Sequence, residues 1–257
     1  MTLGIATRTG TGLIVPAVVL IGWQVASNAH VIDPLFLPPP LSIVVALKAM
    51  SADGTLWQNL APSLMRVAEG YAIGCAIGLI IGLVLGGSEL MRRLFTFQLE
   101  LLRPIPPISL IPVTLLWFGI GSPSKIALIA FASFWSVALS TELGVREIPP
   151  ILKSAAQVME ITGLPYYWEI VIRASLAKIV TGLRLSAAVS LIVLVASEMV
   201  ASPNGIGFLI VDSERNFRPA DMFAAIAVIS LLGYVVNVAL LAIERKLNPQ
   251  LNLSRPS

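Results

Sequence analysis

Long runs without any charged residue constrain this chain more than any other feature of its sequence. Six of them are at or near membrane-spanning length: 9–29, 70–88, 104–124, 126–141, 185–197 and 222–243. A charged side chain at the centre of a membrane helix costs about 2.5 to 3.5 kcal/mol, and about 20 helical residues cross the hydrocarbon layer. We therefore expect an all-α membrane protein with six transmembrane helices.

The composition excludes several other classes of protein. Of the 257 residues, 56% are hydrophobic and 12% are charged, whereas a soluble domain carries about twice that charged fraction. The single cysteine, Cys75, cannot form an internal disulfide. The net charge of +3 comes from bases scattered among apolar runs, so no nucleic-acid partner is indicated.

Lys and Arg between the runs predict the orientation, because loops rich in these residues stay in the cytoplasm. One side carries 11 of them, namely Arg8, Arg92, Arg93, Arg103, Arg146, Lys153, Arg173, Lys178, Arg245, Lys246 and Arg255. The other side carries 4, namely Lys48, Lys125, Arg215 and Arg218. Both termini are therefore predicted to be cytoplasmic.

The run 9–29 has an alternative interpretation as a cleaved signal peptide. Arg8, the apolar residues 12–22 and the small residues 27–29 match that pattern. The run is long for a signal peptide, and Trp23 and Gln24 fit a cleavage region poorly. We favour a retained span.

Glycines recur at every fourth residue of the second run: Gly70, Gly74, Gly78, Gly82 and Gly86. Four residues turn a helix by about 400°, so these glycines form one stripe that another helix can approach closely. Ahead of this run, the segment 30–62 is predicted to be external. It begins with an extended Pro-rich stretch and includes a short amphipathic helix over 41–50 at the membrane surface.

The third run contains Pro104, Pro106, Pro107 and Pro112. Interior prolines remove helical hydrogen bonds and kink the helix, and in lipid the freed carbonyls need protein or water as partners. We expect this span to face a partner or a cavity, with a bent packing helix as the alternative.

The internal segment 144–178 alternates apolar and charged residues. Residues 150–161 place Ile151, Ala155, Val158 and Met159 on one helical face, and a second helix is predicted to begin after Pro165. Such a helix pair forms a docking surface for a soluble partner, or else lies on the lipid headgroups.

Residues for catalysis or metal binding are missing from the sequence. No Gly-Lys dipeptide is present, which excludes a P-loop, and the one histidine, His30, has no partner for a metal site. The chain is therefore predicted not to be an enzyme. Arg66 and Glu69 are spaced to pair with one another, and Arg184 and Glu198 lie near the ends of the fifth span. Few ionisable residues lie within the spans, which argues against an ion-coupled carrier.

Several segments together resemble one family. They are TLWQNL (55–60), SLMRVAEGYAIG (63–74), LLRPIPPISLIPVTLLWFGIG (101–121), SKIALI (124–129), TGLRL (181–185), NGIGFLI (204–210) and FRPADMFAAIAVISLLG (217–233). Their order and spacing resemble the permeases of binding-protein-dependent ABC importers, in the nitrate, taurine and aliphatic sulfonate group. The resemblance implies a type I importer fold for a single permease domain over 1–257, with its core at 62–245, in the bacterial inner membrane.

The resemblance also implies partners. These are ATP-binding cassette subunits that use ATP and Mg, an extracytoplasmic solute-binding protein, membrane lipid, and a second permease copy in a homodimer or a heterodimer. It implies a small anion as solute, with a pyrimidine-type vitamin precursor as the alternative. A non-transporting membrane scaffold is the remote alternative. Pathway residues expected on this basis are Pro106, Pro107, Pro112, Arg184 and Glu198.

The family's coupling loop carries Glu-Ala-Ala, with Gly four residues after the second Ala. Here Ser154-Ala155-Ala156 stand at the first three positions, Glu160 replaces the Gly, and Ile172-Arg173 replace a later Leu-Pro. Because Glu adopts a left-handed turn less easily than Gly, we expect the break to move to Gly163. The departures suggest a diverged ATPase or a non-identical second permease. The resemblance assigns ATPase coupling to Ser154, Ala155, Ala156, Gln157, Met159, Glu160, Gly163 and Leu164.

Overall fold

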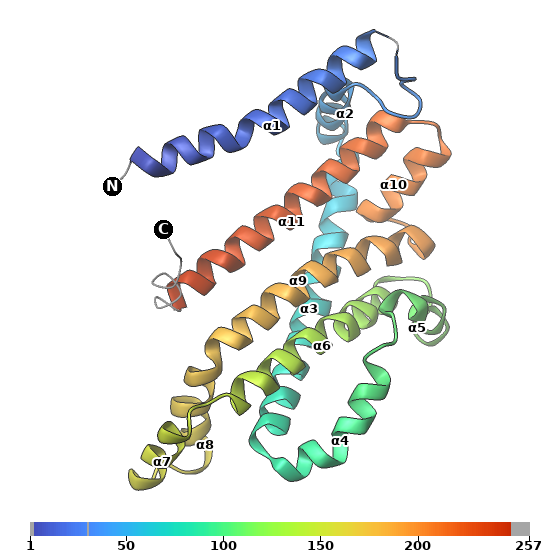
Figure 1. Cartoon of the computed structure of the whole chain (residues 1–257). Coiled ribbons are helices and arrows are strands. Elements are labelled where there is room, and N and C mark those ends of the chain that lie inside the picture. The colour runs from blue at the N-terminus through green and yellow to red at the C-terminus, as the bar shows by residue number, and fades with distance from the viewer. Residues whose placement is uncertain (1–2, 30, 248–257) are drawn as a thin grey trace.

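The computed structural model describes residues 3–29 and 31–247, and this part of the chain is helical and contains no strand (Figure 1). Four long apolar helices have the length of membrane spans. They are α3 (Thr55–Gly87), α6 (Ser122–Arg146), the continuous helix Gly163–Ala201, and α11 (Pro219–Leu247). His30 and Arg255 lie outside the described residues.

The third predicted span is broken rather than merely kinked. It consists of α4 (Glu89–Leu102), the 3₁₀ turn η1 (Pro107–Leu110) and α5 (Ile111–Phe118), with a bend of 82° between α4 and the later part. Counting this pair as one span gives five candidates. The remaining predicted span lies on α1 (Leu3–Asn28), whose described apolar part, Ile14–Asn28, is shorter than a full span. The predicted count of six is therefore not confirmed in full.

The break changes the position of one basic residue. The prediction counted Arg103 in a cytoplasmic loop. The broken span, however, already begins with α4 at Glu89, so Arg103 lies between its two parts. The error arose because α4 contains charged residues, so a search for uncharged runs does not detect it. These residues are Glu89, Arg92, Arg93 and Glu100.

The glycine stripe of α3 packs against α6, as its spacing predicts. A Cβ atom added at Gly70 would lie 2.7 Å from the Cβ of Ile129, and one at Gly78 would lie 2.8 Å from the carbonyl oxygen of Phe134. Side-chain atoms cannot approach that closely, so only glycine permits this distance between the helix axes. The core of the bundle is α3 against α6, with α9 (Ile172–Ala201) packed against α6 and also in contact with α3.

The segment 144–178 contains one short helix, α7 (Pro150–Val158), and the beginning of the next span. The predicted second helix is not separate. It begins at Gly163 with α8 (Gly163–Tyr166), before Pro165, and passes through the π-helical turn η2 (Tyr167–Val171) into α9. Pro fits the first turn of a helix, where its missing amide hydrogen costs no bond, so Pro165 does not delay the start.

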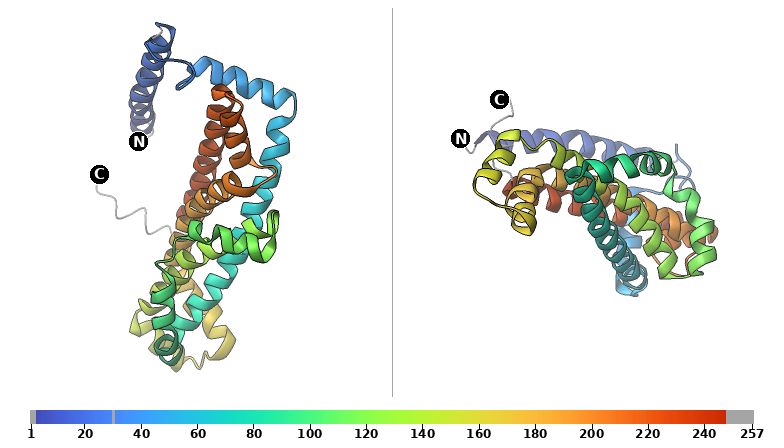
Figure 2. Two further views of the ribbon diagram at one scale, coloured as in Figure 1. Left: turned by 90° about the vertical axis from the view of Figure 1, so that its right-hand side faces the viewer. Right: turned by 90° about the horizontal axis from the view of Figure 1, so that it is seen from below.

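The two ends of the bundle differ, as Figure 2 shows: α2 (Pro40–Ala52) lies at one end, and α7 with α8 at the other. The helix α2 confirms that a helix is present over 41–50, as predicted. It packs with α10 (Ile206–Arg215) and α11 around Met50, Ile206 and Leu209. In Figure 2, α1 runs toward the α2 end and α11 runs away from it.

Candidate coupling segment and pathway

The short helix α7 presents an apolar surface to solvent at its end of the bundle. Ile151, Val158 and Met159 are 75%, 85% and 69% exposed, and Leu164 is 72% exposed. Ser154, Ala155, Gln157, Glu160 and Gly163 are exposed as well. Ala156 alone among the predicted coupling residues is buried, at 1% exposure. The predicted apolar face of this helix therefore has no partner within the described chain. The buried Ala156 anchors α7 to the rest of the bundle.

The end of α7 explains how Glu160 is accommodated. The amide of Ile161 donates to the carbonyl of Ala156 at 2.9 Å, and that of Glu160 donates to the carbonyl of Gln157 at 3.1 Å. These two bonds are those of a Schellman motif, in which the residue at position C′ is left-handed. Glu160 occupies that position with φ of 55°. The break has therefore not moved away from Glu160, contrary to expectation, although Gly163 is also left-handed, with φ of 66°.

This geometry predicts that Glu160→Gly will stabilise the segment. A left-handed non-glycine residue costs about 1 to 2 kcal/mol, partly offset by the extra freedom of glycine in the unfolded chain. We expect Glu160→Gly to lower the rate of proteolysis after α7 by a few fold. Glu160→Val should raise it, because a β-branched residue fits φ above zero poorly. Limited proteolysis of the purified protein measures both, and equal rates for Gly and Val would contradict the geometry.

At the α2 end, Arg66 and Glu198 form a buried ion pair. The guanidinium Nη1 lies 2.7 Å from the carboxylate Oε1, with the residues 3% and 1% exposed. Glu198 also accepts from the Ser63 hydroxyl at 2.8 Å and from the Gly207 amide at 3.0 Å. The predicted pairing of Arg66 with Glu69 is therefore wrong. Arg66 faces α9 across the bundle, and Glu69 is exposed.

The same network holds the start of α10. Its first amides are those of Gly205, Ile206 and Gly207, and each donates to a different side chain, Asn59, Ser63 and Glu198 respectively. Arg66 in addition donates to the Asn204 carbonyl at 2.9 Å. Glu198, expected in the pathway, thus serves here to fix α3, α9 and α10 together, and it lines none of the described cavities.

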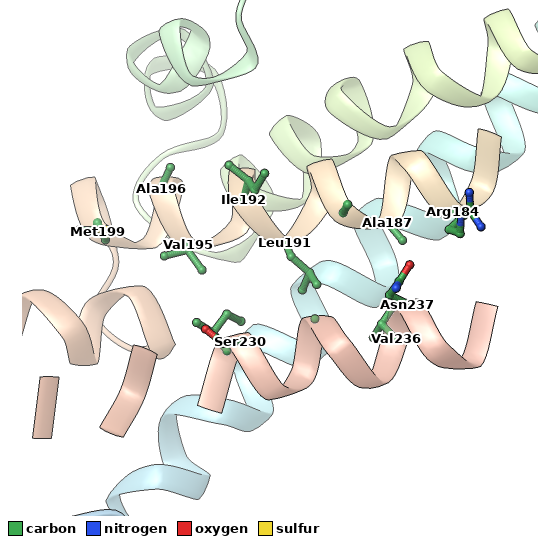
Figure 3. A pocket seen from close by; sticks show the side chains of 13 residues that line it. Arg184, Ala187, Leu191, Ile192, Val195, Ala196, Met199, Ser230, Val236 and Asn237 are labelled. Atoms are coloured by element: carbon green, nitrogen blue, oxygen red, sulfur yellow. The ribbon is translucent and has the colours of Figure 1, made fainter. Parts of the chain in front are cut away.

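Arg184 lies at one end of a groove between α9 and α11 with a volume of about 600 Å³. Figure 3 shows Leu191 and Val195 of α9 pointing toward α11, with Ser230 and Val236 on the opposite helix. The Arg184 guanidinium donates to Glu244 at 2.8 Å, so its charge is neutralised within the chain. The groove is otherwise mostly apolar.

The prolines of the broken span differ in their positions. Pro107 lines a second cavity of about 360 Å³ between the break, α6 and α9. Pro106 and Pro112 are exposed and do not line it. Arg103, Ser136 and Ser140 line the same cavity, and none of them was predicted as a site residue. The dipeptide after Arg103, Pro104-Ile105, was the available indication that the helix breaks there.

Comparison with known families decides the class. Residues 74–252 match the family model described as binding-protein-dependent transport system inner membrane component. The chain belongs to this family. The permease is 36% identical over 239 residues to the taurine transport system permease protein of Escherichia coli (strain K12), covering 91% of this chain and 86% of the relative. It is 32% identical to a putative aliphatic sulfonates transport permease protein of Bacillus subtilis (strain 168), over 92% and 86% of the two chains.

Solved structures confirm the fold class. A chain of the MetNI methionine ABC transporter in an inward-facing conformation aligns with a TM-score of 0.61 at 19% identity, over 75% of the permease and 94% of that chain. At this identity the likeness concerns the fold alone. The predicted all-α type I importer architecture is thus confirmed, and so is the family resemblance.

Proposed function

We propose that this permease imports a small anion, delivered by an extracytoplasmic solute-binding protein and driven by ATP-binding cassette subunits. The exposed apolar face of α7 carries the proposal, because within a permease of this family an uncovered apolar helix at one end of the bundle needs a soluble partner. The relatives named for taurine, aliphatic sulfonates, nitrate and bicarbonate support an anionic solute.

In this proposal the coupling surface consists of Ile151, Ala155, Val158, Met159 and Leu164. Ala156 is buried and anchors α7, which contacts η2, and Val171 of η2 in turn packs with Val145 and Ile148. Because η2 continues directly into α9, a displacement of α7 by the ATPase is transmitted along a single helix to the pathway. ATP and Mg are bound by the ATPase subunits, and two permease copies enclose the pathway.

The α7 end is then cytoplasmic and the α2 end external. The described ends of α1 and α11 both lie away from α2, which supports cytoplasmic termini. The bases that lie near α7, Lys153 and Arg173, agree with this orientation.

Substituting Val158 and Met159 by Asp tests the coupling surface. Both side chains are exposed, so the substitutions remove little buried contact within the chain. An apolar ATPase groove would have to accept unpaired carboxylates, at a cost of several kcal/mol. We expect recovery of the ATPase subunit with the tagged permease to fall at least tenfold, and ATP-driven uptake to be lost.

Val31→Asp is the matched control. Val31 is 77% exposed, like the α7 residues, but it precedes α2 at the other end. This variant should retain the ATPase. Equal recovery of the ATPase with all variants would contradict the coupling role of α7. Uptake of taurine, methanesulfonate and nitrate by the complete transporter tests the solute class.

A further inference from the structure

The cavity at the break of the third span differs from the other described cavities because it is lined by a basic side chain that has no acidic partner. It lies between the break, α6 and α9, and Arg103, Ser136 and Ser140 are its main polar residues. Its volume of about 360 Å³ lies at the lower end of the range for ligand pockets, which suits a solute of a few heavy atoms.

Arg103 is exposed in the single chain, at the level of the middle of the long helices. Across the cavity are Ser136 of α6 and Val189 of α9, and both residues are near the middle of long membrane helices. An arginine at such a depth is costly and is found facing a polar cavity or a functional site. Irregular backbone, such as the break that follows Arg103, is likewise tolerated in membranes only where protein or a water-filled cavity surrounds it.

The charge of Arg103 is not neutralised within the described part of the chain. Arg66 pairs with Glu198, Arg184 with Glu244, and Arg92 and Arg93 with Glu89. Among the described residues no ion pair involves Arg103. Its guanidinium is therefore available to a ligand, unlike that of Arg184 in the α9–α11 groove.

The two serines add hydroxyl donors on one helical face. Ser136 and Ser140 are one turn apart on α6, and both line the cavity. Ser133, which faces the core, is bonded to the Ile129 carbonyl at 2.8 Å. The hydroxyls of Ser136 and Ser140 have no hydrogen-bond partner among the described residues 31–244. Gly182 of α9 lies against Ser140, where an added Cβ would be 3.0 Å from its Oγ, so the small residue makes room for this hydroxyl.

We propose that Arg103, Ser136 and Ser140 form a subsite for a small oxyanion, such as a sulfonate or nitrate, midway along the pathway. The inference rests on the proposed import of small anions and names the residues that receive them. A planar guanidinium binds two oxygens of one anion, and the hydroxyls donate to the remaining oxygen atoms. Entry of the anion also neutralises Arg103 at a depth where an isolated charge is costly.

Uptake by the complete transporter in proteoliposomes tests this subsite, with saturating binding protein and with taurine, methanesulfonate and nitrate as probes. Arg103→Gln should lower uptake about tenfold or more, as loss of a charge-assisted hydrogen bond predicts. Arg103→Lys should retain more uptake than Arg103→Gln. The control is Arg93→Gln, which alters a 77% exposed side chain on α4 and should leave uptake unchanged. ATP hydrolysis stimulated by the binding protein should persist in every variant.

Wild-type uptake rates in Arg103→Gln would overturn the subsite and leave the proposed function standing. If that variant fails to accumulate in the membrane, Ser136→Ala combined with Ser140→Ala decides instead. A several-fold loss of uptake supports the subsite, and unchanged uptake refutes it. If the wild-type transporter takes up none of the three anions, the proposed solute class fails, and the subsite fails with it.

Discussion

Replacing Glu198 by Ala should destabilise the permease by about 3 to 5 kcal/mol, because it leaves Arg66 charged and without its carboxylate partner inside the bundle. The amide of Gly207 and the hydroxyl of Ser63 lose an acceptor at the same time. We expect a lower temperature of unfolding in detergent and a several-fold lower amount in the membrane. Thermal unfolding of the purified protein measures the first quantity.

Glu89→Ala provides the control for burial. Its pairs with Arg92 and Arg93 are on the surface of α4, where the Glu89 side chain is 55% exposed. Exposed ion pairs contribute about 0 to 1 kcal/mol. The double variant Arg66→Met with Glu198→Met should be more stable than Glu198→Ala, because no charge remains buried. If the two alanine variants unfold at the same temperature, the network does not have the stabilising role described here.

Replacing Gly78 by Leu should prevent the permease from assembling. Even a Cβ atom at this position would be 2.8 Å from the carbonyl oxygen of Phe134 and 3.1 Å from the Cβ of Val137. The axes of α3 and α6 would have to separate, and contacts along the whole stripe would be lost. We expect membrane accumulation to fall at least tenfold, with Gly78→Ala intermediate.

Gly22→Leu is the matched control for this substitution. Gly22 lies in an apolar helix, α1, and a Cβ atom added there would have no heavy atom within 4 Å apart from those of its neighbouring residues and its own helix backbone. Quantitative immunoblotting of membranes compares the variants. Normal accumulation of Gly78→Leu would show that the α3–α6 contact is looser than the structure indicates.

The broken span shows how far sequence patterns extended in this protein. Prolines at 104, 106, 107 and 112 predicted a kinked helix facing a partner or a cavity, and Pro107 does line a cavity. The search for uncharged runs nevertheless placed the start of that span after Arg103. The search assumes that a span carries no charged residue, and α4 carries several. The residue with the strongest case for binding an anion was therefore assigned to a loop.

Glu160 shows the opposite kind of error. A rule about residue type predicted that the left-handed turn would leave this position, since glycine is favoured there. The two Schellman hydrogen bonds and the burial of Ala156 fix the end of α7, and they hold Glu160 at φ of 55°. Tertiary packing and capping outweighed a local preference of about 1 to 2 kcal/mol.

The sequence by itself determined the class of this protein, its long apolar helices, a bend at the prolines and the close approach along the glycine stripe. Each of these follows from the solvation of a single segment by lipid or from the spacing of residues on one helix. Only the tertiary structure decided that Arg66 pairs with Glu198, that Arg184 pairs with Glu244, and that Arg103 lines one cavity with Ser136 and Ser140. The physical reason is that these partners are far apart in the chain, and they meet only because the packing of α3, α6, α9 and α11 determines which helix faces lie opposite one another.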